Sequence, residues 1–110
     1  MERRKFLVQG SQEEPYTVTF EKNGSNINAF CTCPAGGMGQ VCKHRFGILF
    51  AVTDGIVSGN IEDVAVVCGW IPGSDIEQAM ANIELAEEDV LRAKKKLSAA
   101  KKGLAKAFRT

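Results

Sequence analysis

The chain has 110 residues, of which 45% are hydrophobic and 25% charged, and its formal net charge is +1. This is the composition of an ordinary globular chain, and the length fits one domain with an additional element. No stretch approaches the roughly 20 consecutive apolar residues of a membrane helix, and the first residues lack the apolar run of a signal peptide. We therefore expect no membrane association and a cytoplasmic location.

The charge is distributed unevenly along the chain. Residues 1–74 carry six Lys/Arg against seven Asp/Glu, whereas residues 75–110 carry eight against six, with the acidic residues first. The larger, amino-terminal part is thus not broadly basic. Composition alone therefore does not indicate a nucleic-acid-binding protein.

The amino-terminal half predicts a small β-structure. Lys5–Gln9 is expected to form a short strand, and Tyr16–Glu21 alternates aromatic or β-branched residues with Thr and Glu, as a half-buried strand does. An Asn-Gly pair at 23–24 predicts a hairpin with a type I′ turn, because both central residues of that turn need positive φ. The returning strand is expected over Asn26–Cys33, where Pro34 stops it.

Two short helices are expected next. Val41–Val52 carries apolar residues at helical spacing, and the Asp-Gly pair at 54–55 is a plausible helix end. A second helix is predicted to start after Asn60 as its N-cap, before a break at Gly69–Gly73. The residues of this helix expected to face inward are Val64, Val67 and Cys68.

Residues 74–110 form the most regular segment. Ser74 and Glu77 match a capping box at a helix start. Branched apolar residues recur every seven positions from Ile76, and alanines recur every seven from Ala79, which is the a/d pattern of a coiled coil. The positions expected at an oligomer interface are Ile83, Ala86, Val90, Ala93, Leu97, Ala100 and Leu104.

Alanine at every d position allows a partner helix to approach closely. Because acidic residues fill the first half of this segment and basic residues the second, an antiparallel self-pair would set opposite charges against each other. We therefore expect a homodimer through this helix. Packing onto the amino-terminal domain and pairing with an unrelated helix are the alternatives, and the charge layout would also complement the helix macrodipole.

Three of the four cysteines and the only histidine lie within residues 31–44. Three thiolates and one imidazole are a common ligand set of closed, tetrahedral zinc sites. Cys31 and Cys33 can converge because residues i and i+2 of a strand share a face. The same spacing does not share a face on a helix, so Cys42 is expected in the turn before the helix and His44 in its first turn.

Other interpretations of this cluster agree less well with its spacing. Redox pairs usually show C-x-x-C, and a catalytic Cys–His pair needs a third orienting group. A buried cysteine cluster and an iron–sulfur ligand set are further alternatives. Four protein ligands fill the coordination shell of zinc, so we expect one structural Zn²⁺ per chain and no enzymatic activity.

With the hairpin residues 16–30 and helix residues 45–50 on its flanks, the pattern C-x-C-x(8)-C-x-H resembles a SWIM-type zinc finger. The resemblance implies a ββα zinc unit that binds DNA or other proteins. No enzymatic domain is recognisable beside the finger, so activities of larger family members are not implied. The expected partner is nucleic acid, DNA rather than RNA, or a larger DNA-processing protein complex. The candidate nucleic-acid contacts are Lys43, Arg45, Arg3, Arg4 and Lys5.

These expectations combine into an α+β fold. A zinc-binding head over residues 1–73, with its zinc motif at 31–44, is followed by a long amphipathic helix over residues 74–110.

Overall fold

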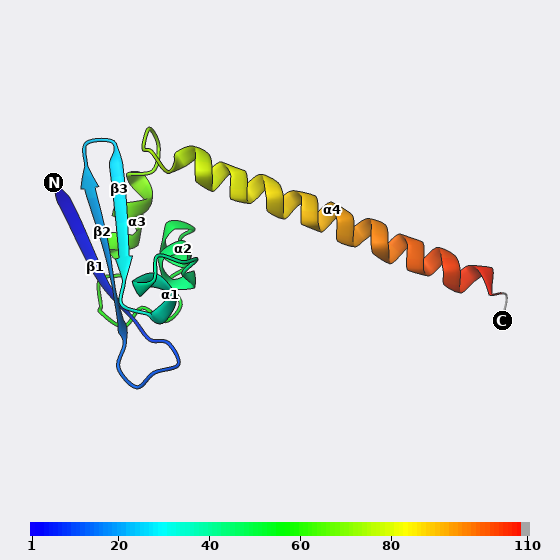
Figure 1. The fold of residues 1–110 in the computed structure, drawn as a ribbon, viewed down its shortest axis with the longest axis horizontal. Coiled ribbons are helices and arrows are strands. Elements are labelled where there is room, and N and C mark those ends of the chain that lie inside the picture. Colours follow the sequence, from blue (N-terminus) through cyan, green and yellow to red (C-terminus); the bar gives the residue numbers. More distant parts are fainter. Residues whose placement is uncertain (109–110) are drawn as a thin grey trace. The chain divides into compact units, whose positions relative to one another are not determined.

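The computed structural model describes residues 1–108 and shows the predicted α+β fold: a three-stranded antiparallel sheet, short helices and a long carboxy-terminal helix (Figure 1). Residues 109 and 110, the end of the predicted segment 74–110, lie outside the described range. The elements are β1 (Glu2–Val8), β2 (Tyr16–Asn23), β3 (Asn26–Cys31), α1 (Pro34–Gly37), α2 (Lys43–Leu49), α3 (Glu62–Gly69) and α4 (Glu77–Ala107).

The chain divides into two compact units. The first, Met1–Glu77, is called the head below; the second begins at Gln78 and consists of α4. Among the described residues, no helix has both the length and the apolar character needed to cross a bilayer.

One face of the sheet carries the core of the head. The strands lie in the order β1-β2-β3, and Phe6 pairs with Val18, which in turn pairs with Cys31. Phe6 and Phe20 meet edge to face, with ring centroids 6.2 Å apart. Helices α2 and α3 complete this core with Ile48, Val64, Val67 and Trp70. The core therefore joins the hairpin to segments far from it in the sequence.

The hairpin is confirmed, but its turn lies one residue later than expected. Asn23 pairs with Asn26, so the loop is Gly24–Ser25, and φ is positive at Gly24 (63°) but not at Ser25. Glycine at the first central position with a single positive φ is the pattern of a type II′ turn, not type I′. The pairing decides this, because a shift of one residue would turn the buried side chains of β3 to the open face.

Strand β3 ends at Cys31, earlier than the predicted end at Cys33. Cys33 instead is the N-cap of α1, a short helix that was not predicted because its segment contains glycines at 36 and 37. Helix α2 ends at Leu49, before the predicted stop at 54–55. Its end is a Schellman motif in which Ala51 has φ 64°, its N–H donates to Ile48 O, and the Val52 N–H donates to Gly47 O.

Asn60 was predicted to cap α3, but its side chain does not do so. Its Nδ2 donates to the carbonyl of Lys5 (2.8 Å) and to Asp63 Oδ2 (3.0 Å), and Ile61 precedes the helix. Asn60 therefore ties β1 to the start of α3. Val64 and Val67 are buried as expected, whereas Cys68 is only partly buried.

The expected capping box does not form the start of α4, because the head holds the two residues between Ser74 and Glu77. Helix α4 begins at Glu77, and Ile76, placed in the heptad by the sequence, packs against the head core. Asp75 accepts a hydrogen bond from the N–H of Ile27 (3.0 Å) and donates its own N–H to Ser25 O (2.9 Å). Asp75 thus occupies polar backbone groups at the start of edge strand β3.

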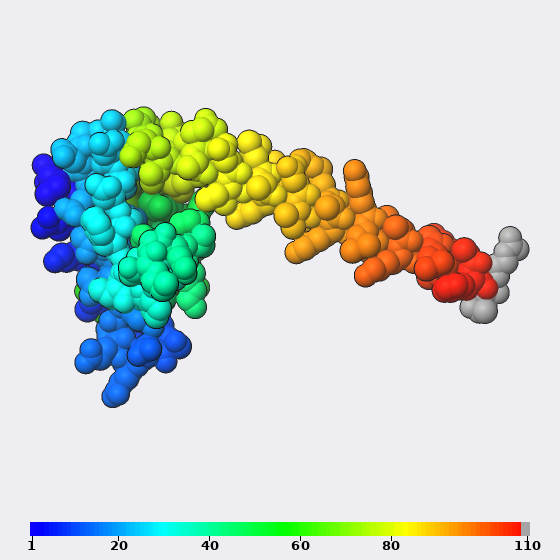
Figure 2. Space-filling view, viewed as in Figure 1, coloured from blue at the N-terminus to red at the C-terminus, as the bar shows by residue number. Residues whose placement is uncertain are grey.

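Helix α4 is one uninterrupted helix in which no residue is buried. Figure 2 shows its side chains standing along a single helical rod. The apolar seam predicted from the heptads therefore has no cover within its own unit.

Candidate metal centre

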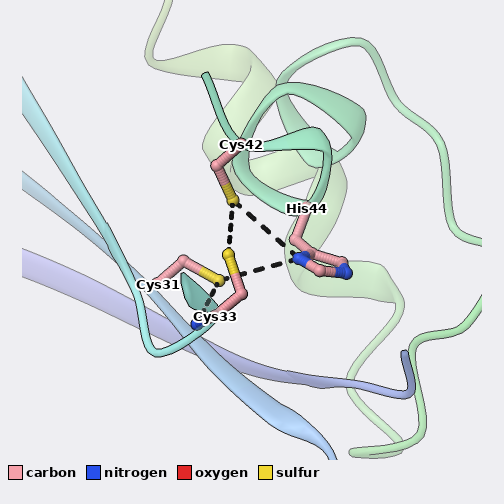
Figure 3. A group of neighbouring side chains, drawn as sticks. All are labelled: Cys31, Cys33, Cys42 and His44. Carbon is pink, nitrogen blue, oxygen red and sulfur yellow. Dashed lines mark hydrogen bonds between the residues drawn. The ribbon is translucent and has the colours of Figure 1, made fainter. Parts of the chain in front are cut away.

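Four ligand-type side chains meet where β3, α1 and α2 begin or end. Cys31 closes β3, Cys33 is the N-cap of α1, Cys42 is the N-cap of α2, and His44 lies in the first turn of α2. Their ligand atoms all lie within 4.8 Å of one another. Figure 3 shows the three sulfurs and the imidazole converging on one point. The structure thus brings together all four residues of the predicted ligand set.

The distances within the cluster fit a tetrahedral zinc ion. Sγ of Cys33 and Sγ of Cys42 are 3.4 Å apart, and His44 Nδ1 lies 3.8 Å from Cys31 Sγ and 3.9 Å from Cys42 Sγ. With Zn–S near 2.3 Å and Zn–N near 2.0–2.1 Å, a tetrahedron spaces its ligand atoms by about 3.5–3.8 Å. The residues present therefore suit one zinc ion, with Nδ1 as the histidine ligand.

Two glycines allow the chain to wrap around this point. A Cβ on Gly36 would lie 2.7 Å from both Cβ and O of Cys31, so only glycine fits there without displacement. Gly39 has φ 69°, the left-handed conformation that glycine adopts readily. The Gly36 N–H also donates to Cys33 Sγ (3.2 Å), which fixes the position of this sulfur at the start of α1.

The thiols differ in acidity in the metal-free cluster. Burial, reinforced by the neighbouring thiols, raises the pKa of Cys31 to about 12. Burial acts in the same direction on Cys42, but backbone N–H donation at Arg45 and hydrogen bonds from Cys33 and Cys31 outweigh it and lower the Cys42 pKa to about 6. At neutral pH the cluster therefore contains a thiolate at Cys42 and a thiol at Cys31, whose proton must leave when metal binds.

The ring of Tyr16 packs against the imidazole of His44 and helps to position it. The two rings lie with centroids 5.1 Å apart at 43°, and Gly10 leaves room for them, since a Cβ there would lie 2.6 Å from Tyr16 Cε2. The second nitrogen, Nε2, is buried without a hydrogen-bond partner. His44 also lines a cavity of about 340 Å³ bordered by Lys43. Sequence reasoning treated Tyr16 only as a strand residue and missed this role.

The guanidinium of Arg45 links β3 to the segment that precedes α2. Its Nη1 donates to Ala29 O (3.1 Å) on β3, and its Nη2 donates to Gln40 O (2.6 Å) before α2. Arg45 therefore holds the edge strand against the metal-binding loop.

The remaining candidate nucleic-acid contacts do not share one surface. Arg4 lies with its guanidinium 5.9 Å from the Trp70 ring and 3.6 Å from Asp63. Lys43 is exposed on α2. Arg3 and Lys5 alternate with the buried residues of β1 and so lie on the open face of the sheet.

The fold and the closed Cys₃His cluster define a small zinc-binding module. Residues 16–52 match the family model of the SWIM zinc finger. This segment holds the hairpin, α1, α2 and all four ligands, so it is a SWIM zinc finger whose cluster offers four ligands to one zinc ion. Strand β1 and helix α3 lie outside the matched segment and complete its core. Neither the curated proteins nor the solved structures contain a significant match to the chain.

Proposed function

We propose that this protein is a non-enzymatic, zinc-stabilised module that binds nucleic acid, DNA in particular, through the open face of its sheet. The observation that carries the proposal is a row of three side chains across the strands. Lys5 pairs with Thr19, which pairs with Phe30, and Phe30 is 55% exposed. A SWIM finger supports the proposal, because the resemblance implies binding to DNA or other proteins.

The chemistry of this row suits a nucleic-acid strand. An exposed aromatic ring provides a surface on which a base can stack, and a lysine beside it can neutralise a phosphate. Arg3 adds a second cation: it pairs with the partly buried Glu21 (2.8 Å), but its own side chain is 51% exposed and accessible to a phosphate. All four metal ligands come from the chain, which leaves no open coordination position for catalysis.

Salt-dependent binding of labelled single- and double-stranded DNA to the zinc-loaded chain tests the proposal. Lys5→Ala should reduce the log–log salt slope by about 0.7–0.9, the contribution of one phosphate. Phe30→Ala should weaken binding by about 1–3 kcal/mol with little change in slope.

Lys43→Ala is the matched control, because Lys43 is an exposed lysine on α2 instead of the sheet. A loss of slope with Lys43→Ala but not with Lys5→Ala would move the contact surface to α2. Absence of any binding at low salt would overturn nucleic-acid binding altogether.

The second candidate function is assembly through α4. Val90, Leu97 and Leu104 on its seam are 53%, 56% and 59% exposed. An isolated helix cannot bury its own apolar stripe and gains stability from packing against a partner. Sedimentation should therefore show a homodimer that Ala86→Leu or Ala93→Leu weakens, because bulk at these positions forces the helices apart. A chain that stays monomeric at high concentration would contradict this function.

A further inference from the structure

We infer that α4 pairs with α4 of a second copy antiparallel and in one defined register, with Val90 opposite Ala93 of the second copy. This inference rests on the proposed assembly function and specifies its partner and geometry. The other layers follow outward from the centre. They are Ala86 opposite Leu97, Ile83 opposite Ala100, and Ala79 opposite Leu104, each occurring twice through the twofold axis.

The sizes of the seam residues favour this register. Every layer combines one branched side chain with one alanine, so the two helices keep a uniform, close separation along their length. A parallel pair in register would instead set Val90 against Val90 and Ala93 against Ala93. Wide and narrow layers would then alternate, leaving gaps at the alanines or crowding at the branched residues.

The charges that flank the seam favour the antiparallel register independently of side-chain size. In the antiparallel register, Glu87 lies beside Lys94 of the second copy, and Asp89 lies beside Lys96 of the second copy. All four residues belong to the continuous helix and are exposed. Both contacts are attractive, and the twofold axis doubles each of them. Asp89 forms an exposed ion pair with Arg92 one turn along the same helix, a contact weak enough to exchange.

A parallel pair makes a worse set of contacts with the same residues. Asp89 would still meet a lysine, Lys94, but Lys96 would lie beside Lys101, and Glu87 would lie beside the neutral Asn82. One attraction is then offset by one repulsion. The antiparallel arrangement is also self-complementary, as an interface between two identical copies must be.

Charge reversal at 87 and 94 separates the two arrangements. Sedimentation of the zinc-loaded full chain at low salt should show that Glu87→Lys and Lys94→Glu each weaken the dimer by roughly tenfold. The double variant should return to within about threefold of the unmodified chain, because the reversed pair is again attractive. Glu88→Lys, the same change one residue away on the outer face, is the control and should have little effect.

Each alternative gives a different pattern. In a parallel pair, Lys94→Glu would weaken the dimer, Glu87→Lys would not, and the double variant would stay weak. That pattern would overturn the antiparallel inference but leave dimerisation through α4 standing. If neither charge reversal changes a dimer that forms, the seam is not the interface, and the inference fails. A monomeric unmodified chain would overturn both the inference and the assembly function, without bearing on nucleic-acid binding.

Discussion

Cys33 and Cys42 lie nine residues apart in the chain, yet their sulfurs approach to 3.4 Å because each residue caps the start of a helix. Both side chains are buried. Holding thiols together in this way costs loop-closure entropy and desolvation, which metal coordination offsets. The conformation of the finger is therefore coupled to zinc.

Zinc removal is expected to destabilise the head. One zinc ion per chain should be found by elemental analysis, and chelation should lower the midpoint of the cooperative thermal transition followed by near-ultraviolet circular dichroism. At free zinc 1,000 times its Kd, the ion contributes about 4 kcal/mol to the stability of the folded head. Cys33→Ser should lower zinc affinity by at least about 100-fold, measured by competition with a chelator.

Cys68→Ser is the control for this loss. Cys68 lies outside the cluster, where its thiol faces the carbonyls of Ile48 and Leu49. Its substitution should leave one zinc ion per chain. Equal zinc affinities for the Cys33 and Cys68 variants would contradict the ligand set.

Zinc affinity is expected to rise with pH. In the metal-free head the Cys31 pKa is raised to about 12, so this thiol is protonated at neutral pH and zinc must displace the proton. This group alone makes the affinity increase about tenfold per pH unit below that pKa. The Cys42 pKa is lowered to about 6, so its protonation adds to the loss of affinity only as pH falls below about 6.

Chelator competition between pH 5 and pH 8.5 measures this slope. Calorimetry in buffers of different ionisation enthalpy should show release of at least one proton per zinc bound at pH 7.5. An affinity that does not change between pH 6.5 and pH 8 would be inconsistent with a protonated Cys31.

Gly36→Ala is expected to destabilise the zinc-loaded head by about 1–3 kcal/mol. The added Cβ would lie 2.7 Å from Cys31 O, a backbone atom of the strand end that carries a ligand. Gly37→Ala is the matched control in the same short helix, since a Cβ there has nothing within 4 Å. Denaturant unfolding in excess zinc compares the two variants, and similar stabilities would refute the close approach.

Ala51→Gly is expected to stabilise the head by up to about 1 kcal/mol. Ala51 has φ 64°, a left-handed conformation that costs a residue with a Cβ about 1–2 kcal/mol and glycine almost nothing, although glycine also loses more chain entropy on folding. Ala65→Gly, the same substitution at an exposed position inside α3, should instead destabilise by about 1 kcal/mol. Thermal denaturation of both variants measures the difference, and the same sign for both would contradict the strain at Ala51.

Local patterns predicted the hairpin, helices α2 and α3 and the position of His44 in the first turn of α2. In several places where the predictions failed, a contact from elsewhere in the chain decided the outcome. Strand pairing moved the hairpin turn to Gly24–Ser25, and Asn60 was drawn to the carbonyl of Lys5. Asp75 and Ile76 were expected in the long helix but are held by β3 and the head core.

The sequence by itself determined the zinc ligand set and the heptad seam. Each depends on residue type and on spacing within one continuous segment, through the periods of strand and helix and the ligand preferences of zinc. Only the tertiary structure decided which side chains surround them. Arg45 donates a hydrogen bond to β3, and Tyr16 packs against His44. Lys5 and Phe30 lie in one row on the open face of the sheet. These relationships join residues far apart in the chain, and their positions follow from strand register and core packing, which no local pattern encodes.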